Sequence, residues 1–131
     1  MNDLLLFVYG SLRRDRVQRH HPLLRCAEYV DRATTRGKLY RVSWHPGFQP
    51  DGSGGPVAGE VFRIPAERRE EMQRALDGYE GSDFQLQPIT AVLPDGSEAM
   101  VNTYEWLGDP SAATYLPEGD FGPANGHPPD A

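Results

Sequence analysis

The sequence has little cysteine and no long apolar run, and both absences narrow the class of protein. Cys26 is the single cysteine among 131 residues, so no disulfide can form within the chain. A domain of this length can fold on its apolar core alone, and an unpaired cysteine is typical of a reducing compartment. The first apolar run is too short to span a bilayer, and Asp3 stands where a secretory signal has basic residues. We therefore expect a cytoplasmic protein with no membrane partner.

An excess of positive charge is also missing. The formal net charge is −6, whereas binding to a phosphate backbone needs a basic face. We therefore expect no nucleic-acid partner. Basic residues do gather early in the chain, at Arg13, Arg14, Arg16, Arg19 and Arg25. This cluster is either solvated surface or an anion site for a small carboxylate substrate.

Several familiar catalytic and metal-binding patterns are absent. His20 and His21 are adjacent, so their side chains diverge, and no partner stands at metal-ligand spacing. His45 and His127 look isolated in loops. The glycine-rich "DGSGG" lacks the Gly-Lys-Ser/Thr ending of a phosphate loop, and no Gly-x-Ser-x-Gly nucleophile motif occurs. The sequence therefore predicts no metal site.

Apolar runs and alternating apolar positions predict the strands. These segments are residues 3–10, 28–42, 57–64, 84–93 and 98–107. Within 28–42 we expect strand, turn and strand, with Gly37 at a turn or bulge. The Pro- and Gly-rich residues 43–56 predict a loop, and "PDGS" at 94–97 predicts a hairpin turn. The count is then about six strands.

Residues 65–81 predict a helix. Pro65 suits the first helical position, Glu70 and Arg74 are spaced for an ion pair, and Gly78 suits a helix end. An apolar stripe recurs at helical spacing, formed by Met72, Ala75, Leu76 and Tyr79. Strands and helices in this order predict an α+β fold, a mixed β-sheet curled into a small β-barrel with one or two flanking helices. We expect one domain over residues 1–122 and a disordered Pro- and Gly-rich tail over 123–131.

The end of the first strand is a candidate binding site. Tyr9 precedes a turn in which Gly10 allows the backbone to approach a ligand closely. Consecutive amides in such a turn can hold an anion. The alternative is an ordinary strand end with Tyr9 half buried.

Glu80 is the second candidate. We expect it just beyond the helix end, on an irregular segment that packing holds in place. A carboxylate that is partly buried there has a raised pKa and can exchange protons near neutrality. The alternative is a surface acid in a loop.

Five motifs occur together in one order along the chain. They are "FVYGSLR", "GKLYRV", "GEVFRI", "LDGYEG" and "VNTYEW". This ordered set resembles the gamma-glutamylcyclotransferase-like family, which includes the AIG2-like proteins and the gamma-glutamylamine cyclotransferases. The resemblance covers roughly residues 4–122. It implies a small mixed β-barrel with flanking helices and the cyclisation of a gamma-glutamyl amide to 5-oxoproline, with no metal or organic cofactor.

The resemblance also implies roles for particular residues. The family's substrate-pocket turn maps onto Tyr9, Gly10, Ser11 and Leu12. The family's catalytic acid follows a Leu-Asp-x-x-Glu pattern, which maps onto Leu76, Asp77 and Glu80. Glu80 would then be the catalytic base and proton donor, and the partner would be a small gamma-glutamyl substrate. Tyr104 and Tyr115 are possible pocket residues, with simple packing as the alternative for each.

The chain departs from the family after "EG". Members often carry a tyrosine and then a basic residue there, whereas this sequence has Phe84 and then Gln85 or Gln87. That leaves a non-catalytic binding module of the same fold as the alternative to an enzyme. A third alternative, an interaction scaffold, would need a large exposed apolar patch. The alternatives for the substrate are free glutathione, a gamma-glutamyl amino acid, a gamma-glutamyl amine and a tailoring substrate.

Overall fold

Seven strands and one α-helix make up the described chain. The computed structural model describes residues 3–10, 24, 26–42 and 45–121. The strands are β1 (Leu4–Val8), β2 (Glu28–Val42), β3 (His45–Pro50), β4 (Gly55–Ile64), β5 (Phe84–Val92), β6 (Glu98–Trp106) and β7 (Thr114–Tyr115). The helical segments are the 3₁₀ turn η2 (Ala66–Arg68), the α-helix α2 (Arg69–Glu80) and the 3₁₀ turn η3 (Pro110–Ala112). Ser11, Leu12, the basic cluster and the expected tail at 123–131 lie outside the described residues.

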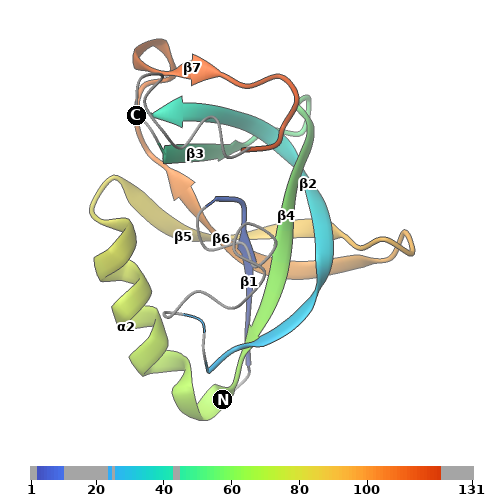
Figure 1. Ribbon diagram of the computed structural model, residues 1–131, viewed down its shortest axis with the longest axis vertical. Coiled ribbons are helices and arrows are strands. Elements are labelled where there is room, and N and C mark those ends of the chain that lie inside the picture. The colour runs from blue at the N-terminus through green and yellow to red at the C-terminus, as the bar shows by residue number, and fades with distance from the viewer. Residues whose placement is uncertain (1–2, 11–23, 25, 43–44, 122–131) are drawn as a thin grey trace, which may run out of the picture.

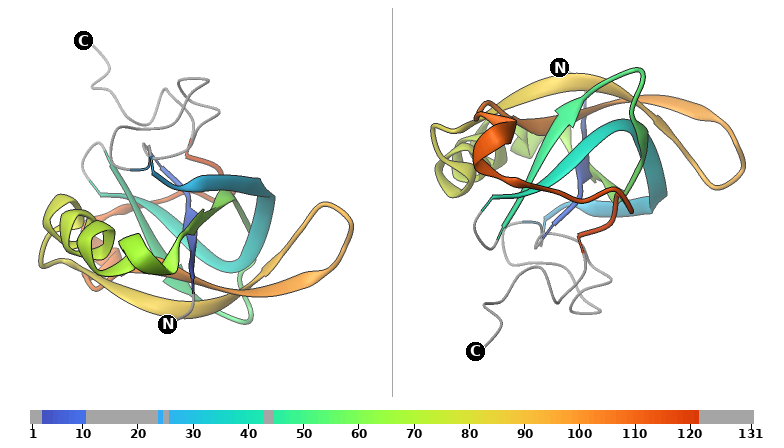
Figure 2. Two further views of the ribbon diagram at one scale, coloured as in Figure 1. Left: turned by 90° about the horizontal axis from the view of Figure 1, so that it is seen from below. Right: turned by 90° about the horizontal axis from the view of Figure 1, so that it is seen from above.

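The strands form a closed mixed barrel with one flanking helix (Figure 1). Their order is β3-β2-β4-β1-β6-β5, and β5 returns to β2 through the pair Val92 and Thr34. Only β1 and β6 run parallel among the described pairs, with Leu6 opposite Asn102. Figure 2 shows α2 against one side of this barrel and the tip of the β5–β6 hairpin projecting from the other. The predicted α+β barrel is thus confirmed.

Strand β1 joins two apolar clusters, because its side chains alternate between the faces of the sheet. Phe7 points into the cluster inside the barrel, where Phe48 is fully buried. Leu6 and Val8 belong to the cluster between the sheet and α2, which also holds Leu76. The predicted buried strand is confirmed, and its last residues reach the space between barrel and helix.

Two sequence predictions for the segment before β4 are wrong. Strand β2 is continuous across Gly37, and its register shift falls between Tyr29 and Asp31. Gly37 is buried against β3, where a Cβ would lie 2.4 Å from Phe48 Cε1. Residues 43–56 were predicted as a loop, but His45–Pro50 pair with β2. Prolines are tolerated in β3 because it is an edge strand.

Helix α2 ends later than the sequence predicts. The predicted end at Gly78 is wrong, because the helix continues to Glu80 and Gly81 follows with φ 85°. Pro65 is extended and precedes η2, so it is not the first residue of the α-helix. Of the predicted apolar stripe, only Met72 and Leu76 are buried. From Asp77 to Tyr79 the residues are exposed, and Glu80 is partly buried.

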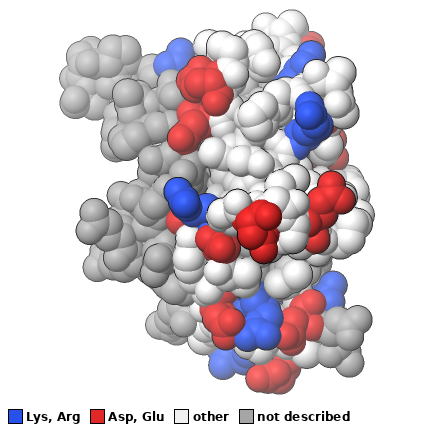
Figure 3. All heavy atoms as spheres, turned by 90° about the vertical axis from the view of Figure 1, so that its right-hand side faces the viewer, with Lys and Arg blue, Asp and Glu red and all other residues white. Residues whose placement is uncertain are grey.

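The hairpin and the ion pair on α2 agree with the sequence. Strands β5 and β6 form the predicted hairpin, with Gly96 at φ 89° in its turn. The expected Glu70–Arg74 pair has an N–O distance of 3.2 Å. Acidic and basic side chains are interspersed over the face in Figure 3, without one large patch of either sign. No helix in the described ranges is both long and apolar enough to cross a membrane.

Candidate active site

The parallel strands β1 and β6 end at the same edge of the barrel, and two hydrogen bonds hold their ends together. The Thr103 hydroxyl donates to the carbonyl of Phe7 over 2.9 Å. The Tyr9 hydroxyl donates to the carbonyl of Tyr104 over 2.5 Å. All four residues are buried. These two hydrogen bonds hold the end of β1 against the end of β6. The chain leaves β1 at this point, next to the C-terminal end of α2.

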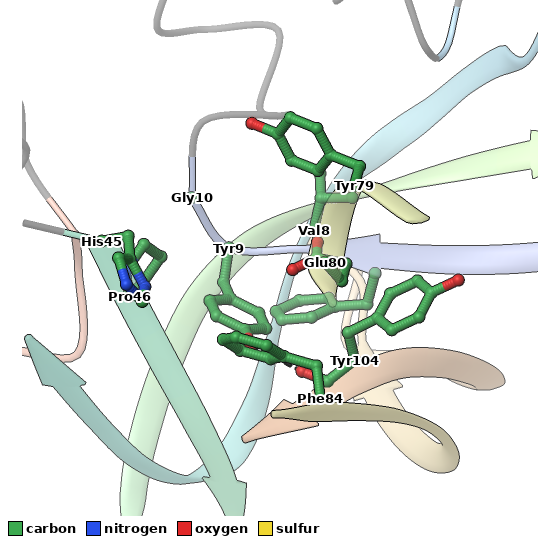
Figure 4. A pocket seen from close by; sticks show the side chains of 10 residues that line it. Val8, Tyr9, Gly10, His45, Pro46, Tyr79, Glu80, Phe84 and Tyr104 are labelled. Carbon is green, nitrogen blue, oxygen red and sulfur yellow. Dashed lines mark hydrogen bonds between the residues drawn. The ribbon is translucent and has the colours of Figure 1, made fainter. Parts of the chain in front are cut away.

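A cavity of about 270 Å³ opens at this edge. Its wall consists of Phe7, Val8, Tyr9, Gly10, His45, Pro46, Tyr79, Glu80, Phe84 and Tyr104. Figure 4 shows that these side chains come from β1, β3, α2, β5 and β6. Five elements therefore meet around a small space with an aromatic wall.

Glu80 is the only carboxylate in the described wall of the cavity. It occupies the last position of α2 and is partly buried. Burial raises the pKa of its carboxyl group to about 7, because removal from water disfavours the charged form. Such a group is charged in part of the molecules at neutral pH, so it can both take up and release a proton.

Two tyrosines next to Glu80 keep their protons. Burial raises the pKa of the Tyr9 hydroxyl, and the charge of Glu80 acts in the same direction. Burial likewise raises the pKa of Tyr104, together with the hydrogen bond that its hydroxyl donates to Asp77 over 2.6 Å. Tyr9 and Tyr104 therefore act as fixed hydrogen-bond donors.

Gly10 forms the cavity wall where β1 meets β3. A Cβ at this position would lie 2.4 Å from Cγ of Pro46, which is closer than two carbon atoms that are not bonded to each other can approach. Because Gly10 has no side chain, Pro46 can close over the strand end. Only a glycine at this position lets β3 approach so closely.

The structure brings together four of the residues singled out from the sequence. Tyr9, Gly10, Glu80 and Tyr104 all line the cavity. Tyr115 does not, since it lies on β7 with its ring 5.7 Å from that of Tyr40. Ser11 and Leu12 follow the cavity wall in sequence but are among the residues that the structure leaves undescribed.

Sequence reasoning missed the wall that β3 and β5 contribute. His45 seemed isolated in a loop, yet it begins β3 and lines the cavity with Phe84. Their ring centroids are 6.4 Å apart. Local sequence gave no signal for His45, because two prolines and a glycine in His45–Pro50 are typical of a loop. Phe84, the departure from the family pattern, provides an aromatic surface without a hydroxyl.

A larger groove of about 520 Å³ lies between β2 and β5, away from Glu80. Two polar side chains there are hydrogen-bonded within the protein. The Thr35 hydroxyl donates to the carbonyl of Thr90, and Arg36 donates to the carbonyl of Gly54. The described residues contain no group of three or more His, Cys, Asp or Glu that could hold a metal ion. Glu80, whose raised pKa suits proton transfer, lies in the smaller cavity, so we take that cavity as the candidate active site.

Solved structures share this fold. The chain aligns with YkqA from Bacillus subtilis at 24% identity and TM-score 0.71, covering 91% of this chain but only 39% of YkqA. An AIG2-like protein from Mus musculus aligns at 21% identity and TM-score 0.69, covering 89% of this chain and 88% of the mouse protein. A structure described as a gamma-glutamyl cyclotransferase aligns at 17% identity and TM-score 0.56, covering 88% and 69%.

Sequence comparison gives the family. No curated protein matches the chain. The family described as gamma-glutamyl cyclotransferase, AIG2-like, matches residues 6–122. This range contains every described element from β2 to β7, most of β1 and the whole wall of the cavity. The chain therefore belongs to the gamma-glutamyl cyclotransferase, AIG2-like family.

Proposed function

We propose that this protein cyclises a gamma-glutamyl amide to 5-oxoproline and releases an amine or an amino acid. The observation that carries the proposal is Glu80, a partly buried carboxyl group with a pKa of about 7 in the wall of a small cavity. Membership of the family makes this reaction the first to test. The reaction needs a group that takes a proton from the attacking nitrogen and gives one to the departing nitrogen, and Glu80 suits that task.

The chemistry balances without water or a cofactor. The α-ammonium group of the substrate is not a nucleophile, so Glu80 in its charged form takes one proton from it. The free amine attacks the γ-carbonyl carbon of the same molecule and forms a new C–N bond. The original C–N bond to the leaving group then breaks, and Glu80 returns its proton to the departing nitrogen. The attacking nitrogen loses a second proton as it becomes the lactam N–H, and the released amine takes up that proton. Glu80 ends the cycle in its starting state.

The cavity wall would orient the glutamyl group for this attack. Orientation is a large part of the rate of an intramolecular reaction. The backbone amides of Gly10, Ser11 and Leu12 would hold the α-carboxylate, as the family resemblance implies. Gly10 borders the cavity, which supports its part of this assignment. The buried rings of Tyr9 and Tyr104 would keep water from the reacting atoms.

The test is a panel assay of 5-oxoproline release. The panel contains glutathione, gamma-glutamyl amino acids and gamma-glutamyl amines, and it compares the wild type with Glu80→Gln. Glutamine preserves size but cannot carry the proton, so we expect a loss of kcat of about 100-fold or more. Glu70→Gln is the matched control, because Glu70 lies on the same helix with an exposed side chain paired to Arg74.

The pH profile gives an independent check on the same group. If Glu80 is the base, kcat/KM of the wild type should rise with pH and level off above about 7, where the carboxyl group is deprotonated. Release that Glu80→Gln leaves undiminished would remove Glu80 from the mechanism. No release from any amide, combined with binding of 5-oxoproline or glutamate, would support the binding module instead.

A further inference from the structure

The last turn of α2 is attached to β6 by a hydrogen bond outside the cavity. The Tyr104 hydroxyl donates to Oδ1 of Asp77 over 2.6 Å. Tyr104 is 4% exposed, whereas Asp77 is exposed at the surface of the helix. Figure 4 shows the Tyr104 ring bordering the cavity while its hydroxyl points away from Glu80. The bond therefore joins helix and strand behind the wall, without occupying substrate space.

The hydrogen bond between Tyr104 and Asp77 lies about one helical turn before Glu80. The carbonyl of Asp77 accepts a hydrogen bond from the amide of Gly81 over 3.0 Å, which closes the turn that contains Glu80. Fixing Asp77 therefore fixes the backbone from which the Glu80 side chain projects. The direction of that side chain depends on the orientation of this one turn.

Apolar packing does not secure the turn by itself. Met72 and Leu76 are the buried residues of α2, and both precede Asp77. From Asp77 to Tyr79 every residue is exposed, and Gly78 weakens the helix at this point. Tyr104 is in turn held by its own carbonyl, which accepts the bond from Tyr9. The two hydrogen bonds, from Tyr9 to Tyr104 and from Tyr104 to Asp77, thus connect the end of β1, strand β6 and helix α2.

We propose that Asp77 is a positioning residue, whose hydrogen bond from Tyr104 holds the last turn of α2 on β6 and keeps the Glu80 carboxylate inside the cavity. This inference rests on the proposed function in so far as Glu80 is the base. Asp77 and the Tyr104 hydroxyl touch no reacting atom in this scheme. Loss of either one should lower kcat more than it raises KM, because Glu80 would lie poorly placed for proton transfer.

The neighbourhood of Glu80 matters for the design of the test. Its titratable neighbours in the described wall are Tyr9 directly after β1, His45 of β3, Tyr79 of α2 and Tyr104 of β6. Among the described residues, no Lys or Arg lines the cavity. Asp77→Ala removes a negative charge near Glu80 as well as a hydrogen bond. Tyr104→Phe removes the hydrogen bond and leaves the charge, so the two variants must be compared.

The experiment is a double-mutant cycle in 5-oxoproline release. We expect Asp77→Ala and Tyr104→Phe each to lower kcat about tenfold, which a hydrogen bond to a charged group can account for. The double variant should lose no more than either single variant. Asp77→Asn should recover most of kcat, because its amide oxygen still accepts the bond. Glu70→Ala, which removes an exposed carboxylate from the same helix, is the control.

A second readout needs no activity. Isotope-labelled Glu80 is titrated by NMR in the wild type and in Tyr104→Phe. We expect its pKa to fall from about 7 toward the ordinary range in the variant, because the freed turn lets the carboxylate reach water. If no amide is turned over but this shift occurs, the proposed function fails and the positioning role stands. An unchanged titration, or additive losses of kcat in the double variant, would overturn the positioning role.

Discussion

Glu80 combines two properties that seldom occur together in a carboxylate on a helix. It lies at the end of α2, where side chains usually reach water, yet the aromatic wall buries it and raises its pKa to about 7. A buried carboxyl group destabilises the fold when it is charged, because folding removes the charge from water. The same burial that raises the pKa of Glu80 therefore lowers stability at neutral pH.

The stability of the wild type should depend on pH through this residue. Below about 4.5 Glu80 is neutral in the folded and the unfolded chain, so it costs nothing. Between about 4.5 and 7 the folded chain binds more protons, so its free energy of unfolding falls as pH rises, and above 7 the loss is complete. Glu80→Gln stays neutral throughout, so its stability relative to the wild type should increase over this window.

Urea unfolding of both proteins from about pH 4 to about pH 8 measures this difference. Taking the difference between variant and wild type removes the contribution of the other titrating groups, as far as they do not couple to Glu80. A difference that is constant with pH would mean that Glu80 is hydrated in the folded protein.

At the scale of one element, two glycines near the end of α2 have opposite roles. Gly78 lies inside the helix, and Gly81 follows it with φ 85° and ψ −178°, a conformation that residues with side chains rarely adopt. A Cβ added at either position would meet no atom within 4 Å. Substitution by alanine therefore tests the backbone alone.

We expect Gly78→Ala to stabilise the protein by about 0.5–1 kcal/mol, because alanine loses less conformational freedom than glycine in a helix. Gly81→Ala should destabilise it by about 1–3 kcal/mol, because the residue must keep a strained conformation or move the end of the helix. Thermal or urea unfolding gives both values. Effects of the same sign would contradict the helix end placed at Glu80.

At the scale of the whole molecule, β1 connects the barrel interior with the helix layer. Its side chains enter both apolar clusters, and side chains at its C-terminal end line the cavity. Phe48 is fully buried in the barrel cluster, and Leu76 is fully buried under α2. Because one strand contributes to both clusters, we expect barrel and helix to unfold together.

Truncation in either cluster tests this cooperativity. Phe48→Ala should cost about 3–5 kcal/mol and Leu76→Ala about 2–5 kcal/mol, as is usual for a large side chain removed from a packed core. Each variant should unfold in urea in a single transition with the m-value of the wild type. A second transition or a lower m-value in Leu76→Ala alone would show that α2 detaches before the barrel opens.

The sequence by itself determined the features that depend on neighbours along the chain. The apolar run of β1, the Asp-Gly turn between β5 and β6, and the spacing of Met72 and Leu76 on α2 follow from local periodicity and turn chemistry. The order of the motifs indicated the family. Glu80 and Tyr9 were found in this way, since both stand in those motifs.

Only the tertiary structure decided what depends on segments far apart in sequence. Strand β3 exists because His45–Pro50 pair with β2, although their prolines and glycine indicate a loop. That pairing brings His45 to Phe84 and Pro46 to Gly10. The raised pKa of Glu80 and its support from Tyr104 and Asp77 likewise arise where α2 meets β6. Burial and hydrogen bonding belong to surfaces that meet only in the folded chain, so no local pattern records them.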